Sequence, residues 1–277
     1  TGLILPDSVT GIRDEACKDC VLLQSVTFGN GLERIGDYAF AGCTALREIR
    51  IPDSVTEMGR SAFFECRALE RISLGGGLTY LPDDVFSCCT ALKSVELPAQ
   101  ITEIGAYAFS SCGALETVGF GSGVTKIRQS AFCMCTALTD VTLPDGLQEI
   151  GYNAFSHTAL TALSIPDSVH TLGGAAFADC AALARIELSA HLRELKRDTF
   201  AGCTALTAIT LPDGAESIGD KAFSGCTALT DVFLPDSLRR FAETAFADCG
   251  EALLLHGSAG SAAERFAERY ALAFRAD

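Results

Sequence analysis

The chain has 277 residues, of which 35 are acidic and 21 are basic, so its formal net charge at pH 7 is −14. Because phosphate binding draws on clustered Lys and Arg, this acidic balance argues against nucleic acid as the main partner. The chain is 48% hydrophobic with a mean hydropathy of +0.28. It contains no apolar run near the roughly 18 residues of a membrane helix, so we expect no membrane span.

One repeat of 23 residues runs through the sequence, and it overrides the two domains that length alone would suggest. We number the repeat from the apolar residue that usually precedes Pro or Gly. Nine of the ten spacings between these residues are 23, and the spacing from Leu143 to Ile165 is 22. Position 13 is Phe in ten of the eleven repeats, and position 16 is Cys in ten. The repeats begin at Leu5, Phe28, Ile51, Leu74, Leu97, Phe120, Leu143, Ile165, Leu188, Leu211 and Leu234.

A unit of 23 residues cannot bury its own apolar side chains, but stacked copies place each position over the same position of the next. The repeat therefore predicts a solenoid. Ile49 and Ile51 share one face of a short strand, with Leu46 at the corner, so stacked strands form a parallel sheet along one flank. We expect residues 55–59 to form a second extended stretch, residues 61–66 a tight helical turn, and the Gly at position 9 a turn conformation.

Two segments depart from the repeat. The seventh repeat, residues 143–164, lacks one residue and has no Cys at position 16, so we expect it to interrupt the cysteine ladder and to bend the stack. After Cys249, residues 261–272 have apolar side chains at helical spacing, which predicts a capping helix. We therefore expect one domain, with a solenoid over residues 1–256 and a cap over residues 257–277.

At the other end, the first repeat has nothing before it, and we see no basic and then apolar signal segment. We expect that more repeats or a leader precede this chain in the intact protein. The open first repeat is also a candidate surface for self-association.

The motif F-x-x-C-x-x-L-x-x-I-x-L-P-x-x-V-x-x-I-G-x-x-A-F from Phe40 to Phe63, with its further copies, resembles the BspA-like (Treponema pallidum type) leucine-rich repeat. The segment from Gly257 to Ala267 is similar to the closing segment of that family. The resemblance implies a right-handed superhelix of about eleven repeats with short parallel strands on one flank. It also implies a bacterial surface or secreted protein that adheres to host matrix proteins or other microbes, and it supplies no catalytic residue.

The thirteen cysteines have neither the density of a disulfide scaffold nor the spacing of a zinc site. Stacked equivalents point side by side rather than toward each other, so we expect reduced and shielded core thiols. Cys17 and Cys20 form the one C-x-x-C motif, for which a Phe-to-Cys change beside a ladder thiol competes with a redox or metal role. None of the four histidines forms a nucleophile–base pair with a neighbouring Ser or Cys, so we expect no catalytic residue, cofactor or metal.

The solvent face of the sheet, at positions 21 and 23, remains as the candidate binding surface. Thr and Ser there suit a half-exposed strand, which competes with a binding role. Charged clusters and one exposed aromatic favour partner binding, because Arg and aromatic residues are frequent contact anchors. The candidate residues are Glu48, Arg50, Arg71, Glu96, Asp140, Arg185, Glu187, Asp231 and Phe233. A rival surface carries Tyr38, Tyr80, Tyr107 and Tyr152.

From these features we expect a non-catalytic extracellular or cell-surface module that binds a host or microbial surface protein or glycan. The alternative is a structural spacer or stalk within a larger surface protein.

Overall fold

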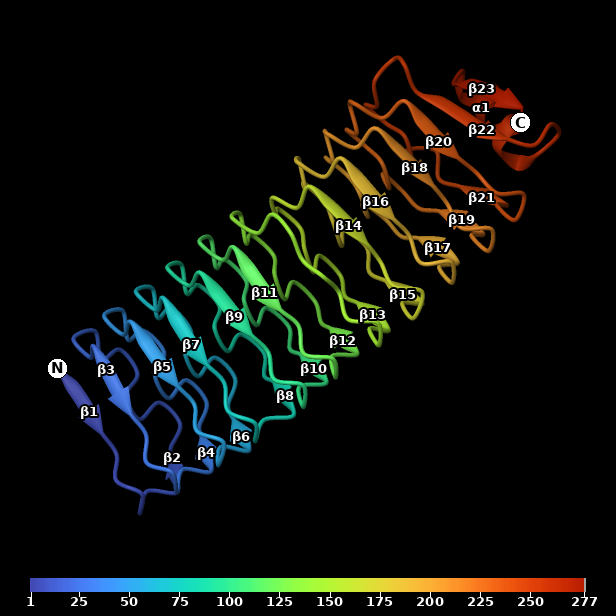
Figure 1. Ribbon diagram of the computed structural model, residues 1–277. Coiled ribbons are helices and arrows are strands. Elements are labelled where there is room, and N and C mark those ends of the chain that lie inside the picture. Colours follow the sequence, from blue (N-terminus) through green and yellow to red (C-terminus); the bar gives the residue numbers. More distant parts are fainter. Residues whose placement is uncertain (277) are drawn as a thin grey trace.

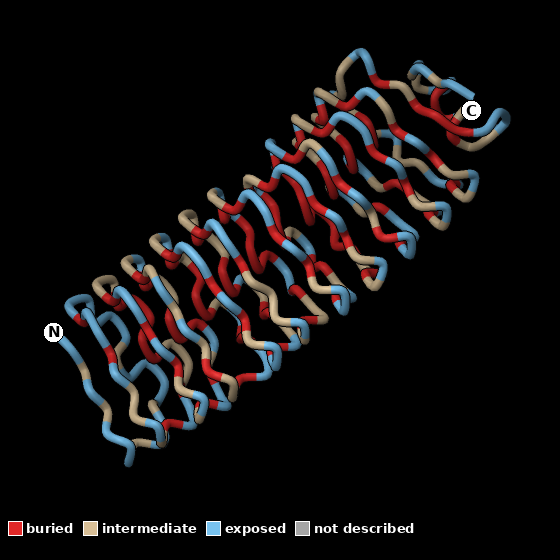
Figure 2. Tube along the Cα trace, in the orientation of Figure 1, coloured by how far each residue is buried: buried red, intermediate tan, exposed pale blue. Residues whose placement is uncertain are grey.

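A computed structural model describes residues 1–276; Asp277, the last residue of the predicted cap, lies outside the described residues. The chain winds into a parallel-strand solenoid of about 12 turns that forms a single elongated rod (Figure 1). Buried residues line the inside of the coils along the rod, except in the first coil, where the inward residues are half-buried (Figure 2). The predicted solenoid is therefore confirmed.

The longer strands lie on one flank of the rod, where the repeat places them, and every coil has one except the coil at residues 140–142. Its central residue is apolar and points inward, as Ile49 does, while its neighbours Glu48 and Arg50 are exposed. Paired strands are parallel and in register with the repeat, so Glu48 lies opposite Arg71 and Ile49 opposite Ile72. These strands are β1 (Gly2–Ile4), β3 (Ser25–Thr27), β5 (Glu48–Arg50), β7 (Arg71–Ser73), β9 (Ser94–Glu96), β11 (Thr117–Gly119), β14 (Ala162–Ser164), β16 (Arg185–Glu187), β18 (Ala208–Thr210), β20 (Asp231–Phe233) and β22 (Leu254–Gly257).

A second ladder of two-residue strands forms another flank of the rod. One of them, Glu57–Met58, lies within the extended stretch predicted at residues 55–59. Each of these strands pairs an outward residue with an inward apolar one, such as Glu57 with Met58. The strands are β2 (Gly11–Ile12), β4 (Arg34–Ile35), β6 (Glu57–Met58), β8 (Tyr80–Leu81), β10 (Glu103–Ile104), β12 (Lys126–Ile127), β13 (Glu149–Ile150), β15 (Thr171–Leu172), β17 (Glu194–Leu195), β19 (Ser217–Ile218) and β21 (Arg240–Phe241).

The segment that returns the chain is a series of tight turns, so the predicted helical turn at residues 61–66 is wrong. Ser61 and Glu65 have left-handed backbone angles, with φ of 53° and 58°. Phe64 N donates to Ser61 O within the coil at 3.0 Å, but Phe63 N donates to Val85 O of the next coil at 2.9 Å. Alternate amides thus bond to the neighbouring coil, which an α-helix would not allow because it uses its amides internally.

The glycines at position 9 have another role than the predicted turn conformation. Their φ angles are not in the left-handed region, which positions 11 and 15 occupy instead. A Cβ added at Gly59 would lie 2.3 Å from Asp37 N, and one at Gly36 would lie 2.5 Å from Asp14 N. Glycine at position 9 therefore lets the backbones of successive coils approach closely.

The interior holds a column of aromatic rings with a row of thiols beside it. The rings at position 13 stack from Phe40 to Phe246, with centroids 5.3–5.8 Å apart. Each ladder thiol from Cys43 to Cys249 reaches back to the preceding coil, as when Cys112 Sγ donates to Phe86 O at 3.2 Å. This bond satisfies a second lone pair of a buried carbonyl, which explains why position 16 prefers Cys to a purely apolar residue of similar size.

The short seventh repeat interrupts one flank only. Residues 140–142, which lead into it, form no strand in the described structure, whereas β12, β13 and β15 on the other flank stay paired. Thr158 occupies the place of the missing ladder cysteine. Its Oγ1 donates to Phe155 O at 2.8 Å and lies 3.2 Å from Cys180 Sγ.

The C-terminal segment covers the last coil, as predicted. Helix α1 (Ala262–Tyr270) begins after Ser261, whose side chain accepts from Glu264 N, and Phe266 packs on Phe241 with ring centroids 4.7 Å apart. The structure adds a strand that the sequence pattern did not predict, β23 (Ala273–Ala276), which pairs in parallel with β22.

Candidate binding surface

The sheet face comprises the outward side chains of the longer strands, at positions 21 and 23. Eight of the nine candidate residues are exposed, and Asp231 is half-buried. The candidates do not converge on one point, because they are spread along the rod from β5 to β20 (Figure 1). Apart from Glu96, they fall into three groups, which lie near the N-terminal end, in the middle and near the C-terminal end.

The N-terminal group is a network of ion pairs across β5 and β7. Arg71 Nη2 lies 2.8 Å from Glu48 Oε2 and Arg71 Nη1 lies 3.7 Å from Glu70 Oε2, while Arg47 Nη1 lies 3.4 Å from Glu70 Oε1. A hydrogen bond from the guanidinium to Glu48 raises the pKa of Arg71. Arg50 lies opposite Ser73 in the register and forms no ion pair with any described residue.

The middle group lines an open groove where the sheet is discontinuous. Asp140, Arg185 and Glu187 all border this groove, whose floor has small side chains: Ala162, Ser164, Ala208 and Thr210. Within the described residues no ladder joins β16 to β18, and β14 pairs with β16 alone. Arg185 and Glu187 lie opposite Ala162 and Ser164 and form no ion pair in the described part of the chain. Their charges are thus available to a partner.

Glu96 lies outside the groove, over β11. A Cβ added at Gly119 would overlap the Glu96 carboxylate, so the glycine lets this side chain lie across the neighbouring strand.

The C-terminal group contains a residue that the sequence reasoning missed. His256 Nε2 lies 2.8 Å from Asp231 Oδ1, and the imidazole stacks on Phe233 with ring centroids 4.4 Å apart. The Thr230 hydroxyl, which donates to Asp231 at 2.8 Å, and then His256 lower the pKa of Asp231. His256 lies opposite Phe233 in the register, one coil later. Extending the 23-residue spacing from Phe233 past the last complete repeat would therefore have placed His256 on the sheet face.

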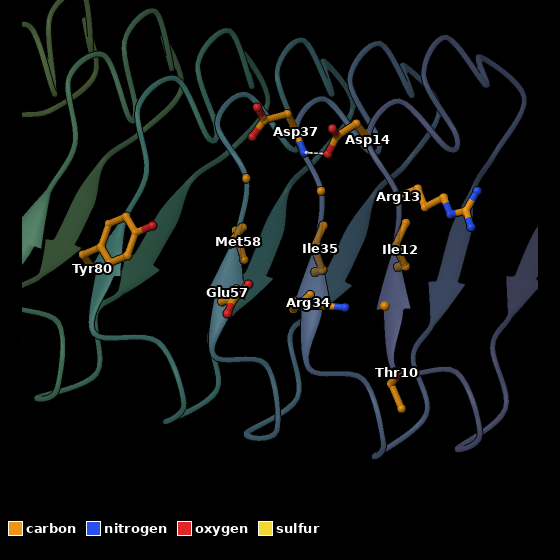
Figure 3. A pocket seen from close by; sticks show the side chains of 13 residues that line it. Thr10, Ile12, Arg13, Asp14, Arg34, Ile35, Asp37, Glu57, Met58 and Tyr80 are labelled. Carbon is orange, nitrogen blue, oxygen red and sulfur yellow. Dashed lines mark hydrogen bonds between the residues drawn. The ribbon is translucent and has the colours of Figure 1, made fainter.

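The rival tyrosines lie on the flank of the second ladder and the turns after it. Figure 3 shows Tyr80, Glu57 and Arg34 on the successive strands β8, β6 and β4 around a shallow pocket, where Asp14 Oδ1 accepts a hydrogen bond from Asp37 N at 2.9 Å. Tyr80 and Tyr152 are 47% and 54% exposed. The carboxylates of Asp14 and Asp37 accept hydrogen bonds from backbone amides of the next coil. We therefore assign them a structural role in joining successive coils and not a role in ligand binding.

The other three histidines also have partners nearby in the structure. His157 lies 3.4 Å from Asp179, His191 Nδ1 lies 2.9 Å from Asp167 O, and His170 contacts its neighbour Thr171. All thirteen cysteines are free, and the ladder thiols from Cys43 to Cys226 are buried. Cys20 is exposed and Cys249 is half-buried, so the prediction that every ladder thiol is shielded is wrong for these two.

Among residues 1–276, no group of three or more His, Cys, Asp or Glu side chains is placed to hold a metal ion. None of the described helices has the length and apolar character to cross a bilayer.

The BspA type Leucine rich repeat region family, in six copies, matches residues 10–139 and 125–252. A leucine-rich repeat protein from Bacteroides ovatus is 27% identical, with a TM-score of 0.72 over 100% of this chain and 84% of the other. A leucine rich cell surface protein from Faecalibacterium prausnitzii is 27% identical, with a TM-score of 0.51 over 95% and 89%. The T. pallidum leucine-rich repeat protein is 33% identical, with a TM-score of 0.52 over 55% and 72%. No curated protein matches the chain.

Proposed function

Since the chain belongs to the BspA-type leucine-rich repeat family, we propose that it is a non-catalytic binding module that works outside the cell or at its surface. In this proposal residues 1–256 form the binding solenoid and residues 257–277 its cap. The partner is a protein or glycan on a host or microbial surface, and it binds to the sheet face. The description of the F. prausnitzii relative as a cell surface protein supports the location.

The observation that carries the proposal is the groove in the middle of the sheet face. Arg185 and Glu187 stand above a floor of Ala162, Ser164, Ala208 and Thr210, and neither is paired with a described residue. Small side chains let a partner approach the backbone closely. The unpaired Arg185 can donate hydrogen bonds to the partner, and the unpaired Glu187 can accept them. Phe233 adds an apolar anchor two coils away on the same face, which is typical of interface hot spots.

The groove also gives the partner a definite chemistry. It contains one cationic side chain, Arg185, and three anionic ones, Asp140, Glu187 and Asp213, so it fits a partner segment with polar groups of both signs rather than a polyanion. The net charge of −14 favours partners with basic surface, because long-range attraction raises the rate of encounter.

Binding to a panel of matrix proteins, mucins and whole bacterial cells tests the proposal. We expect saturable binding by the chain and at least a tenfold loss, about 1.4 kcal/mol, in the double variant Arg185→Ser, Glu187→Ser. The matched control is Tyr107→Ser, Tyr152→Ser on the other flank, which should bind as the parent does. Loss in the control alone would move the site to the tyrosine flank, and no binding by any form would favour the spacer.

The spacer remains the second candidate because the ion-pair network of β5 and β7 satisfies its own charges, as an inert surface does. An inert rod beside a separate binding domain of a longer protein would support it.

A further inference from the structure

One junction between successive repeats has no strand ladder on either flank. The eighth repeat, residues 165–187, holds β15 and β16, and the ninth, residues 188–210, holds β17 and β18. In the described structure β15 does not pair with β17, and β16 does not pair with β18. Every other junction between successive repeats keeps at least one of its two strand flanks paired. We call this junction the joint, because the rod divides here without breaking a ladder.

The missing ladders leave the joint with fewer bonds between backbones. Within the part of the chain that the structure describes, no backbone hydrogen bond joins residues 193–196 or residues 207–211 to the repeat before them. One repeat later the equivalent position is bonded, since Glu216 N donates to Arg193 O at 2.7 Å. The stability of a solenoid is roughly a sum over its repeats and the interfaces between neighbours, so a weak interface opens before the others.

The third flank, which consists of the turns after the second strands, stays joined across the joint. Phe177 N donates to Thr199 O at 3.0 Å, and Asp179 N donates to Ala201 O at 2.6 Å. The rings of Phe177 and Phe200 stack with centroids 5.7 Å apart. This turn flank therefore holds the two repeats together, and it can act as a pivot about which the two strand flanks separate.

Side-chain contacts at the corner between the two strand flanks hold the joint closed. Ser189 is fully buried, and its Oγ donates to Val169 O at 2.6 Å. Ala190 N donates to Asp167 Oδ1 at 2.8 Å, and His191 Nδ1 lies 2.9 Å from Asp167 O. Ser189 stands at position 2, which is Pro or Gly in the ten other repeats, so its hydroxyl contact is specific to the joint.

The binding groove lies directly over the joint. Arg185 and Glu187 on one side of the groove belong to the eighth repeat, whereas Ala208 and Thr210 on the other side belong to the ninth. Separation of the strand flanks therefore changes the width of the groove and leaves each of its sides intact.

We propose that the rod bends at the joint, and that a partner in the groove closes the joint. Bending breaks the contacts of Ser189 and His191 with the eighth repeat and moves the two sides of the groove apart. A partner that contacts both sides binds the closed form more tightly, so its binding shifts the population toward that form. The closure rests on the proposed function, whereas the bending of the free chain does not.

Distances between two nitroxide labels test the bending in the free 277-residue chain. Each label is carried by a keto amino acid, so the native cysteines stay in place. Labels at Gln148 and Glu216 span three junctions that include the joint, and labels at Thr79 and Gln148 span three junctions whose second strands are all paired. All three positions are exposed. We expect a broader distance distribution for the pair that spans the joint.

Two serine substitutions provide a matched comparison. Ser189→Ala removes a hydroxyl bond across the joint, so it should raise the population of the open form roughly two- to tenfold. Ser168→Ala removes a bond of the same length, 2.6 Å to Leu147 O, at a junction where β13 and β15 are paired, and should leave both distributions unchanged. If Ser189→Ala fails to fold, His191→Ala removes the exposed contact of the same corner.

A matrix protein or mucin that binds saturably tests the closure. We expect it to narrow the distribution between Gln148 and Glu216 to the width of the control pair, and to lose this effect in Arg185→Ser, Glu187→Ser. Equal widths for the two label pairs in the free chain, unchanged in Ser189→Ala, would overturn the bending. Saturable binding that leaves the distribution broad would overturn the closure. The free chain decides the bending even where no protein of the panel binds, so the failure of the proposed function and the failure of the joint give different results.

Discussion

The ring of Phe132 lies parallel to the ring of Phe109, with centroids 5.4 Å apart and an interplanar angle of 7°. Phe155 stacks on the other side of Phe132 at 5.3 Å, and Phe120 meets it edge-on at 5.6 Å. Each ring of the column therefore contacts rings that are distant in sequence, and one truncation removes contacts on both sides.

We expect Phe132→Ala to lower the free energy of unfolding by about 3–5 kcal/mol, because it leaves a cavity in a fully buried column. Thr142→Ala, at an exposed position of the same coil region, should change it by less than about 0.5 kcal/mol. Urea denaturation of both variants measures the difference. Equal effects of the two substitutions would contradict the buried column.

Gly59→Ala tests the close approach of successive coils. The added Cβ would lie 2.3 Å from Asp37 N, so the coils must separate, and we expect a loss of about 1–3 kcal/mol in unfolding free energy. Gly146→Ala is the control, because its Cβ would lie 3.8 Å from the nearest atom, Ser122 O. Thermal denaturation should find the control near the parent. A neutral Gly59→Ala would show that the coils do not pack in this way.

Left-handed residues at positions 11 and 15 predict that a glycine can stabilise the chain at such a site. Ala175 has φ of 53°, a conformation that costs alanine about 1 kcal/mol, so Ala175→Gly should raise or preserve stability. At the next residue, Ala176→Gly removes a buried methyl group without relieving strain and should cost about 1 kcal/mol. Chemical denaturation compares the pair, and the opposite ranking would contradict the turn geometry.

The buried thiols predict that the domain loses stability in alkali. Burial raises the pKa of Cys112 from 9.0 to about 12. Below pH 9 the thiol is neutral in both states, so its contribution is fully present. Between these two pH values the unfolded chain releases a proton that the folded chain keeps, and stability falls by about 1.4 kcal/mol per pH unit for each such thiol.

Urea unfolding at several pH values above 9 measures this slope. We expect Cys112→Ala to reduce the slope by the share of one thiol, whereas Ser110→Ala, a neighbour that does not ionise, should leave it unchanged. An unaltered slope in the cysteine variant would show that this thiol is not protected from ionisation by the fold.

The period of the repeat was sufficient to predict the rod, the strand register and the buried Phe column, because each depends on one residue type recurring at one position. The turn after the second strand could not be predicted in the same way. Ser61 and Glu65 are ordinary residues in left-handed conformations, and the hydrogen bonds to the next coil that hold them there involve only backbone.

The candidate binding surface was likewise predictable from the sequence only in part. Exposure of Arg185 and Glu187 followed from the alternation of the strand. The groove beside them did not, because it depends on the break between β16 and β18 and on the missing strand near Asp140. The partner of Asp231 was missed because His256 lies after the last complete motif, where the sequence pattern fades but the register continues.

Hydroxyl-radical footprinting of the chain in complex with a partner from the binding panel tests the central claim most directly. We predict protection at Phe233 and at the side chains of residues 185–187, and unchanged reactivity at Tyr80 and Tyr152 on the other flank. Protection confined to the tyrosines, with Phe233 fully reactive, would contradict the assignment of the sheet face as the binding surface.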